Sequence, residues 1–421
     1  MANEFSKQET VAFERILEGF HDSMVISRNV SKYGTEGQLM ERSNDTVWRP
    51  SPYILASQDR VMGVAVTPQD GTQLSVPSSL GFSKSVPWTM NALELRDALQ
   101  ENRLGKAASQ RLASDINTAV RNVVSLQGTL VVPITAAAGD YDDIALCEAL
   151  MTEQGIEEMN RFMSLNVRDY TGMAGDLAGR ANMQTGKTAT AYERSFIGPV
   201  AGFETYKMQI GNTLAGQSAT PTIATNGAQV RYIPLAAQST TNGEVNVDNR
   251  TQTVTVSSTT GLVAGDAYTI AGIFAVHHIT KESTGRLKTF RVISITNGTT
   301  MVVSPPMVGA NSSPTDPEIN YQNVDVDSTS ATAAMVFLNT TTAQANPFWY
   351  YDSIELLPGR YAIPTDQGVS VLRATTENGI EVVMSKKFDN STFETLFTLD
   401  TLFGVVNTDP EMNGILLFGQ S

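Results

Sequence analysis

Apolar side chains recur every four residues over a long stretch in the first third of the chain. The repeat consists of Leu104, Ala108, Leu112, Ile116, Val120 and Val124, while Arg103, Gln110, Arg111, Asp115 and Arg121 occupy the other faces. This spacing predicts one helix from about residue 91 to 127, with a cap at Asn91 and a stop at Gly128. Such a helix would span about 50 Å, which is a long strut for a compact globule.

The composition limits the class of protein. A chain of 421 residues is expected to form two or more domains, and 41% hydrophobic with 17% charged residues is ordinary for a folded protein. A net charge of −14 argues against nucleic-acid binding through phosphates, although a protein that encloses DNA without gripping it remains compatible. The single cysteine, Cys147, fits a reducing compartment, and we expect neither a signal peptide nor a membrane helix.

Two segments precede the long helix. The first is a predicted helix in which Ser6 and Glu9 have capping-box spacing. Its apolar positions are Val11, Phe13, Ile16, Leu17, Phe20 and Met24. From Arg42 to Trp88 five prolines interrupt any helical pattern, so we expect a long arm or loop with strands there.

The later segments alternate between helix and strand. A third helix is expected over 142–154, stopped at Gly155, with Cys147 inside it as a buried small hydrophobe rather than a nucleophile. Between about Gly211 and Pro347 the chain becomes rich in Thr, Val and Gly without a helical period. Two β-branched runs there flank Asn297-Gly298, which predicts a hairpin with a type I′ turn. We interpret this block as an all-β module inserted into an α+β host.

One triplet suggests a nucleotide site. Gly186-Lys187-Thr188 are the residues that close a phosphate-binding loop, but Ala181 stands where the motif needs its first glycine. No apolar strand precedes the segment. A plain surface loop is therefore the favoured interpretation, and the hypothesis of an enzyme has no other support.

Metal sites are not predicted either. His277 and His278 are adjacent and would point to opposite faces of a strand, and His21 is far away in the sequence. The run Asn323 to Thr329 begins like a calcium loop, but it has Ser328 where glycine is needed and Ala334 where the bidentate Glu belongs. We predict no catalytic residue, no cofactor and no metal ion.

Several segments, taken in order, resemble one family. "VNVDNRTQTVTVSSTTGLVAGD", preceded by "PVAGFETYK" and followed by the Asn-Gly hairpin, is similar to the insertion domain of the major coat protein of the short-tailed phage P-twenty-two and its relatives. "RSNDTVWRP", "LRDAL", "QRLASDINTAV", "AYER" and "NPFWYYDSIELLP" extend the resemblance over nearly the whole chain. The ordered set carries the resemblance, because no single piece is a strong motif.

The resemblance implies a fold and a function. The fold is the α+β Hong Kong 97 capsid fold with an inserted β-barrel domain. Its parts would be an N-terminal arm (1–41), an E-loop region (42–88), a peripheral and axial core (89–211 and 347–421) and the inserted barrel (212–346). The function would be that of a structural, non-enzymatic major capsid protein, assembled in the host cytoplasm into pentamers and hexamers of an icosahedral head around double-stranded DNA. A phage decoration protein or a bacterial surface protein with an Ig-like module is the alternative.

The resemblance also implies partners and contact residues. The subunit would bind copies of itself, a scaffolding protein and a portal protein at one vertex. The resemblance leaves open whether a decoration protein binds. Glu14 falls where the family carries an acid for the scaffolding protein, and Glu18 lies one helical turn further on. The family's charged hairpin between capsomers is mostly neutral here until Glu244 and Asp248, so hydrogen bonds from Ser and Thr would have to replace its ion pairs.

Overall fold

A computed structural model describes most of the chain. The described residues are 9–14, 16, 26–34, 46–55, 59–65, 71–91, 98–179, 191–209, 211–226, 232–241, 243–309, 318–325, 329–363, 370–376 and 379–420. They form a mixed α+β structure, as expected, in two compact units. The first unit comprises 1–47, 78–122 and 354–406, and the second comprises 48–77, 123–353 and 407–421.

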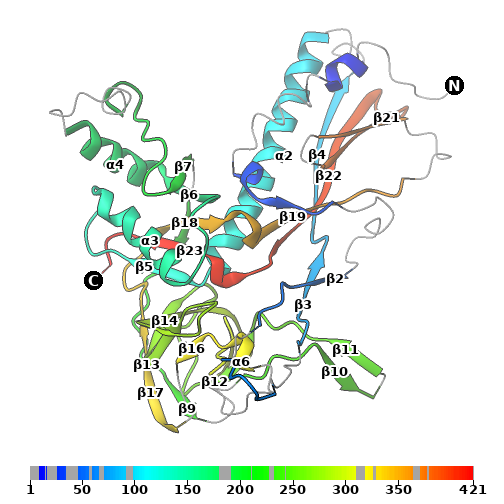
Figure 1. Ribbon diagram of the computed structural model, residues 1–421. Coiled ribbons are helices and arrows are strands. Elements are labelled where there is room, and N and C mark those ends of the chain that lie inside the picture. The colour runs from blue at the N-terminus through cyan, green and yellow to red at the C-terminus, as the bar shows by residue number, and fades with distance from the viewer. Residues whose placement is uncertain are drawn as a thin grey trace. The chain divides into compact units, whose positions relative to one another are not determined.

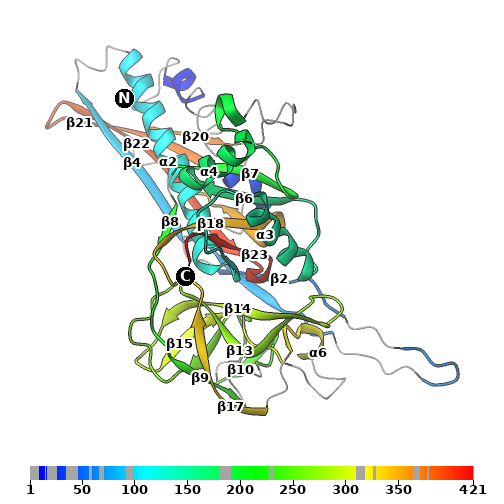
Figure 2. The same ribbon diagram turned by 90° about the vertical axis from the view of Figure 1, so that its left-hand side faces the viewer.

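The first unit is a six-stranded sheet with the long helix alongside it. The sheet has the order β1-β19-β22-β21-β20, and β4 pairs with β22. Figures 1 and 2 both show α2 running beside β4 and β22. The elements are η1 (Ser27–Asn29), β1 (Ser31–Lys32), β4 (Phe82–Asn91), α2 (Ala98–Gln127), β19 (Ile354–Pro358), β20 (Ser370–Thr375), β21 (Glu381–Asp389) and β22 (Glu394–Asn407).

Helix α2 confirms the predicted buried face. Five of the six apolar repeat positions are buried, and Leu104 is half-buried. The predicted start at Asn91 is wrong, because Asn91 is the last residue of β4 and the described helix begins at Ala98. Its thirty residues span about 45 Å.

Gly128 ends α2, but not for the expected reason. A glycine that stops a helix usually does so with a positive φ angle, and Gly128 has none. Instead, a Cβ there would lie 2.8 Å from Oδ1 of Asn413 and 2.9 Å from Cα of Gly414. Glycine is required because strand β23 (Asn413–Leu417) passes so close to the helix end.

The second unit contains a six-stranded sheet with two helices. The strand order is β5-β23-β18-β6-β7, and β8 pairs with β18. Cys147 in α3 is buried in the apolar core that the helices form with this sheet, so its expected role as a small hydrophobe is confirmed. The elements are β5 (Leu130–Pro133), α3 (Tyr141–Glu153), β6 (Arg161–Asn166), α4 (Val167–Gly179), β7 (Phe203–Met208), β8 (Asn212–Leu214), β18 (Ala343–Tyr350), η4 (Tyr351–Ser353), η5 (Pro410–Met412) and β23 (Asn413–Leu417).

A seven-stranded sheet forms the second layer of this unit. Its order is β12-β15-β14-β13-β17-β9, with β16 paired to β13. The outer strands meet, because Ile223 of β9 bridges Val256 just after β12, so the sheet curls into a barrel around its own apolar core. The elements of this barrel are β9 (Thr222–Asn226), β12 (Gln252–Thr255), β13 (Ala267–Val276), β14 (Ser283–Ile295), β15 (Thr300–Ser304), α6 (Glu318–Tyr321), β16 (Val324–Asp325) and β17 (Thr329–Phe337).

The Asn-Gly hairpin is present, but its turn differs from the prediction. Strands β14 and β15 pair antiparallel around Asn297-Gly298. Neither residue has a positive φ angle, so the predicted type I′ turn is wrong. The Asn297 side chain closes the loop instead, since its Oδ1 accepts a hydrogen bond from the Thr299 N–H at 2.9 Å.

Two ribbons complete the second unit. Strands β2 (Thr46–Pro50) and β3 (Ser75–Ser79) pair at the base of a long extended loop. Strands β10 (Ala237–Thr240) and β11 (Gly243–Asn246) form a separate hairpin, which Figure 1 shows apart from the other strands of the barrel. Within the described ranges, no helix combines the length and the apolar character needed to cross a membrane.

Candidate assembly surfaces

The N-terminal helix is held against the first unit by its apolar side. Phe13 and Ile16 are buried, as the sequence pattern predicts, while Leu17 and Phe20 lie outside the described residues. On α2, a Cβ at Gly105 would lie 2.3 Å from Cδ1 of Ile16. Only glycine at this position lets the two helices approach so closely.

An ion pair fixes the same helix to the sheet. Glu9 is 5% exposed, and its carboxylate forms an ion pair with the Lys386 ammonium of β21. Ser6, the other half of the predicted capping box, lies outside the described residues.

The two scaffold-contact candidates differ in what the structure says of them. Glu14 lies on the helix and is exposed, on the side away from the buried Phe13 and Ile16. Glu18 lies outside the described residues, so its position relative to Glu14 stays a prediction.

The β10–β11 hairpin presents a polar, exposed surface. The register places Ser239 opposite Glu244 and Gln238 opposite Val245. The hydroxyl of Thr240 donates to the carbonyl of Gly243 at 2.7 Å, which closes the end of the hairpin. Glu244 is exposed and faces a neutral cross-strand neighbour, so its charge is available to an outside partner.

Asp248, the other hairpin candidate, is already engaged within the chain. Its carboxylate accepts two hydrogen bonds from the guanidinium of Arg250, at 2.9 and 2.7 Å. The same guanidinium donates to the carbonyl of Asn407 at 2.7 Å. Asp248 therefore anchors the base of the hairpin. This arrangement could not be predicted from sequence patterns, because Asn407 is far along the chain.

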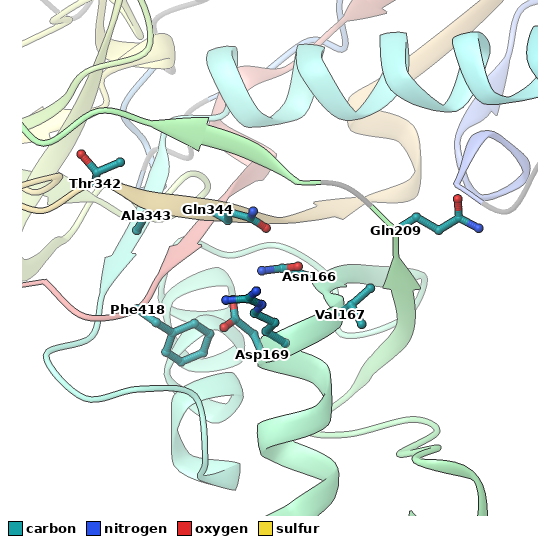
Figure 3. A pocket seen from close by; sticks show the side chains of 9 residues that line it. Asn166, Val167, Asp169, Gln209, Thr342, Ala343, Gln344 and Phe418 are labelled. Atoms are coloured by element: carbon teal, nitrogen blue, oxygen red, sulfur yellow. The ribbon is translucent and has the colours of Figure 1, made fainter.

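A pocket of about 650 Å³ opens in the second unit (Figure 3). Two of its nine lining residues ionise, Arg168 and Asp169. The Asp169 carboxylate is committed to the fold, because it accepts a hydrogen bond from the Asn346 amide at 2.8 Å, and burial raises the pKa of this carboxyl. The lining offers neither a nucleophile with a base nor a set of metal ligands.

The two adjacent histidines lie in a turn, and one of them forms hydrogen bonds that hold it. His277 and His278 follow β13 in a turn rather than lying on a strand, so that expectation is wrong. Nδ1 of His277 accepts the N–H groups of Ile279 and Thr280, which uses the imidazole to hold the turn. Among the described residues, no three His, Cys, Asp or Glu side chains are placed to share a metal ion.

Two further segments were possible sites in the sequence, the calcium-like run and the Gly-Lys-Thr triplet. The side-chain amide of Asn323, the first residue of the calcium-like run, donates to the carbonyl of Pro306 and to the carboxylate of Glu411, and its oxygen accepts from the N–H of Val308. The segment with Gly186-Lys187-Thr188 lies outside the described residues, so the structure does not test its interpretation.

Comparison with known proteins decides the family. The model of the family described as "P22 coat protein - gene protein 5" matches residues 1–419. The chain belongs to the P22 coat protein family. This coat protein is therefore a major capsid protein, a structural component of an icosahedral phage head, and the alternative of a decoration or surface protein is not favoured.

Solved structures of phage capsids are also similar to the chain. A structure from Mycobacterium phage Che8 is 10% identical with a TM-score of 0.45, and the match covers 94% of this chain and 90% of that one. The capsid of cyanophage P-SCSP1u is 8% identical with a TM-score of 0.43, covering 93% and 86%. The I-domain of the CUS-3 coat protein is 36% identical with a TM-score of 0.22, covering 30% of this chain and 99% of that domain.

Proposed function

We propose that this coat protein builds its head from pentamers and hexamers, with the Hong Kong 97 type of subunit. In this proposal residues 1–41 are the N-terminal arm, 42–88 the E-loop region, and 89–211 with 347–421 the peripheral and axial core. Residues 212–346 are the inserted domain. The role is structural and non-enzymatic, and assembly takes place in the host cytoplasm around a space that receives double-stranded DNA.

The observation that carries self-assembly is the extended loop between β2 and β3. The described part of this loop exposes five large apolar side chains, with Met62 94% exposed. These residues are Tyr53, Leu55, Val61, Met62 and Val64. A lone subunit loses stability by holding such a row in water, whereas a neighbouring copy of the chain would bury it.

The proposed partners follow from the exposed charges and from the family. A scaffolding protein with a basic segment would dock on Glu14 and Glu18. The β10–β11 hairpin, with Glu244 as its exposed acid and Asp248 at its base, would reach a neighbouring capsomer. A portal protein would replace coat subunits at one vertex, and a decoration protein would be an optional addition to the outer surface.

Electron microscopy and sedimentation of the purified protein test this proposal. Wild-type protein, with its phage's scaffolding protein, should form closed shells, and Met62→Asp should reduce their yield at least tenfold because it places a charge in a contact that excludes water. Ile279→Asp is the matched control, since Ile279 is also apolar and 67% exposed but lies on a barrel turn. Dispersed wild-type monomers at all concentrations, or equal loss in both variants, would refute the assignment of this loop.

A further inference from the structure

The end of helix α2 lies unusually close to the barrel. Gly265 has a φ angle of +98°, and a Cβ there would lie 2.9 Å from Cδ2 of Leu126, in the last turn of α2. The positive φ angle favours glycine here, and any larger residue would press on the Leu126 side chain. The barrel is built to touch this end of the helix.

Helices α2 and α3 are each followed closely by a glycine, but they end in different ways. Helix α3 completes its own cap, because Gly155 has a φ of +85° and the N–H of Ile156 donates to the carbonyl of Met151 at 3.1 Å. Helix α2 has no such turn. Gly128 lacks a positive φ, and its N–H satisfies only the carbonyl of Val124, at 2.9 Å. The last carbonyls of a helix have no partner within it, so α2 needs donors from elsewhere.

Strand β14 of the barrel supplies those donors. Arg291 donates from Nη2 to the carbonyl of Ser125 in the last turn of α2. The hydroxyl of Thr289 donates to the carbonyl of Thr129, just beyond the helix. Residues two apart on a strand share a face, so one face of β14 is directed at the end of α2.

The charge of Arg291 is costly to bury where it lies. The side chain is 0% exposed, and burial lowers its pKa to about 9, against the opposing effect of Asp266. Among the described residues, its Nε and Nη1 have no hydrogen-bond partner. Arg161, which is 1% exposed, differs because its guanidinium donates to the carbonyls of Ile156 and Glu157 and to the hydroxyl of Thr152.

Asp266 is the natural counter-ion. It is 1% exposed, and its carboxylate accepts hydrogen bonds from Gln217, Asn339 and the N–H of Val263, all of them neutral donors. Gln217 lies on the segment that enters the barrel and Asn339 on the segment that leaves it. Asp266 is thus fixed in position, and its negative charge, together with the negative end of the α2 dipole, offsets the buried cation.

We propose that Arg291 is the C-terminal cap of α2, supplied by the barrel, and that the buried carboxylate of Asp266 offsets its charge. The last turn of α2 is then stably formed only while the barrel is folded against it. When the barrel loses structure, the last turn of α2 loses this guanidinium as its hydrogen-bond donor. Neither the helix end nor the buried charge has another sufficient partner.

Hydrogen exchange of the full-length protein, read by mass spectrometry over residues 119–129, tests the cap. Arg291→Met keeps the length and the apolar stem but removes the charge and the donors, and should speed exchange in the last turn of α2 about tenfold or more. Arg286→Met is the matched control on the same strand. Its cation is 47% exposed and pairs with Glu153 at 2.8 Å, so α2 should exchange as in the wild type.

Two further variants keep the test decisive. Arg291→Lys retains the charge without the planar fork and should give an intermediate exchange rate, and it replaces Arg291→Met if the latter is insoluble. Asp266→Asn should speed exchange in the last turn of α2 as well, because it removes the negative charge that offsets the buried Arg291 cation. Unchanged exchange at 123–129 in both Arg291 variants would overturn the cap, and an effect of Asp266→Asn confined to the segments around Gln217 and Asn339 would overturn the role of Asp266.

Discussion

The sheet of the first unit and the barrel of the second are built from the chain in opposite ways. All strands of the barrel come from one stretch, Thr222–Phe337. The sheet of the first unit pairs β1 with β19 and β4 with β22, and the strands of each pair are separated by hundreds of residues. Closing long loops costs chain entropy before any contact offsets it, so the barrel can form early and locally, whereas the first unit needs nearly the whole chain.

The largest expected effect tests how far the first unit depends on α2. Ile116 is fully buried, and Asn117 beside it accepts hydrogen bonds from the N–H and the hydroxyl of Ser27, so this helix holds distant segments together. Ile116→Asp should leave insoluble protein, because a buried charge without a partner costs about 4 kcal/mol or more. Solubility after expression is the measurement.

Ser114→Asp is the control for this substitution, because Ser114 is exposed on the same helix. It should remain soluble and assemble. Leu112→Asp should fail in the same way as Ile116→Asp, and soluble, assembly-competent protein from either buried position would mean that the helix packs on another face.

The second prediction tests the independence of the barrel. A fragment of residues 211–347 should be soluble, with a strand-dominated circular dichroism spectrum and a cooperative thermal transition, because its apolar core is formed by its own strands. An unfolded or helical fragment would contradict this independence. A fragment of 78–122 alone, from the first unit, should have no stable structure, in contrast to the barrel.

The sequence predicted the parts that depend on local patterns. The buried face of α2, the limits of α3, the strands in the described parts of 42–88 and the β block all follow from periodicity, prolines and β-branched runs. The errors fell where contacts between distant residues decide. Gly128 ends α2 because β23 approaches it, and Asn297 closes its hairpin with its side chain instead of the expected backbone conformation.

The candidate site residues show the same division. The pattern placed Phe13 and Ile16 inside and Glu14 outside, which the structure bears out for burial. It could not show that Arg250 ties Asp248 to the carbonyl of Asn407, or that Glu9 holds the N-terminal helix through Lys386, because Asn407 and Lys386 lie far along the chain.

The third prediction concerns the surface of the first unit. Glu14→Lys, alone or with Glu18→Lys, should weaken assembly with the scaffolding protein severalfold without unfolding the subunit, because an exposed substitution costs little stability. Raising salt should have the same effect on the wild type, since screening shortens the reach of surface charges to about 8 Å at physiological ionic strength. Sedimentation of procapsids across a salt series is the measurement.

Gln110→Lys is the matched control, because Gln110 is an exposed residue of α2 in the same unit and the change also adds a positive charge. It should assemble normally. A normal procapsid yield from folded Glu14→Lys/Glu18→Lys protein would remove both acids from the scaffolding contact.

The smallest effect is expected on the β10–β11 hairpin, and it contrasts the two surfaces directly. Glu244 is exposed and faces Ser239, so Glu244→Gln removes a charge without disturbing a contact within the chain. If neutral hydroxyl and amide groups make the inter-capsomer contact, the stability of the shells to denaturant should change by less than about 0.5 kcal/mol per subunit, and salt should matter little.

Asp248→Asn should have a larger effect, because it weakens the contact of Arg250 with the carbonyl of Asn407 that fixes the hairpin's base. Release of coat subunits from purified shells, followed by light scattering at two salt concentrations, measures both. A strong, salt-dependent loss of shell stability in Glu244→Gln would show that one acid is enough for an electrostatic contact. The hairpin and the N-terminal helix would then both bind their partners through charge.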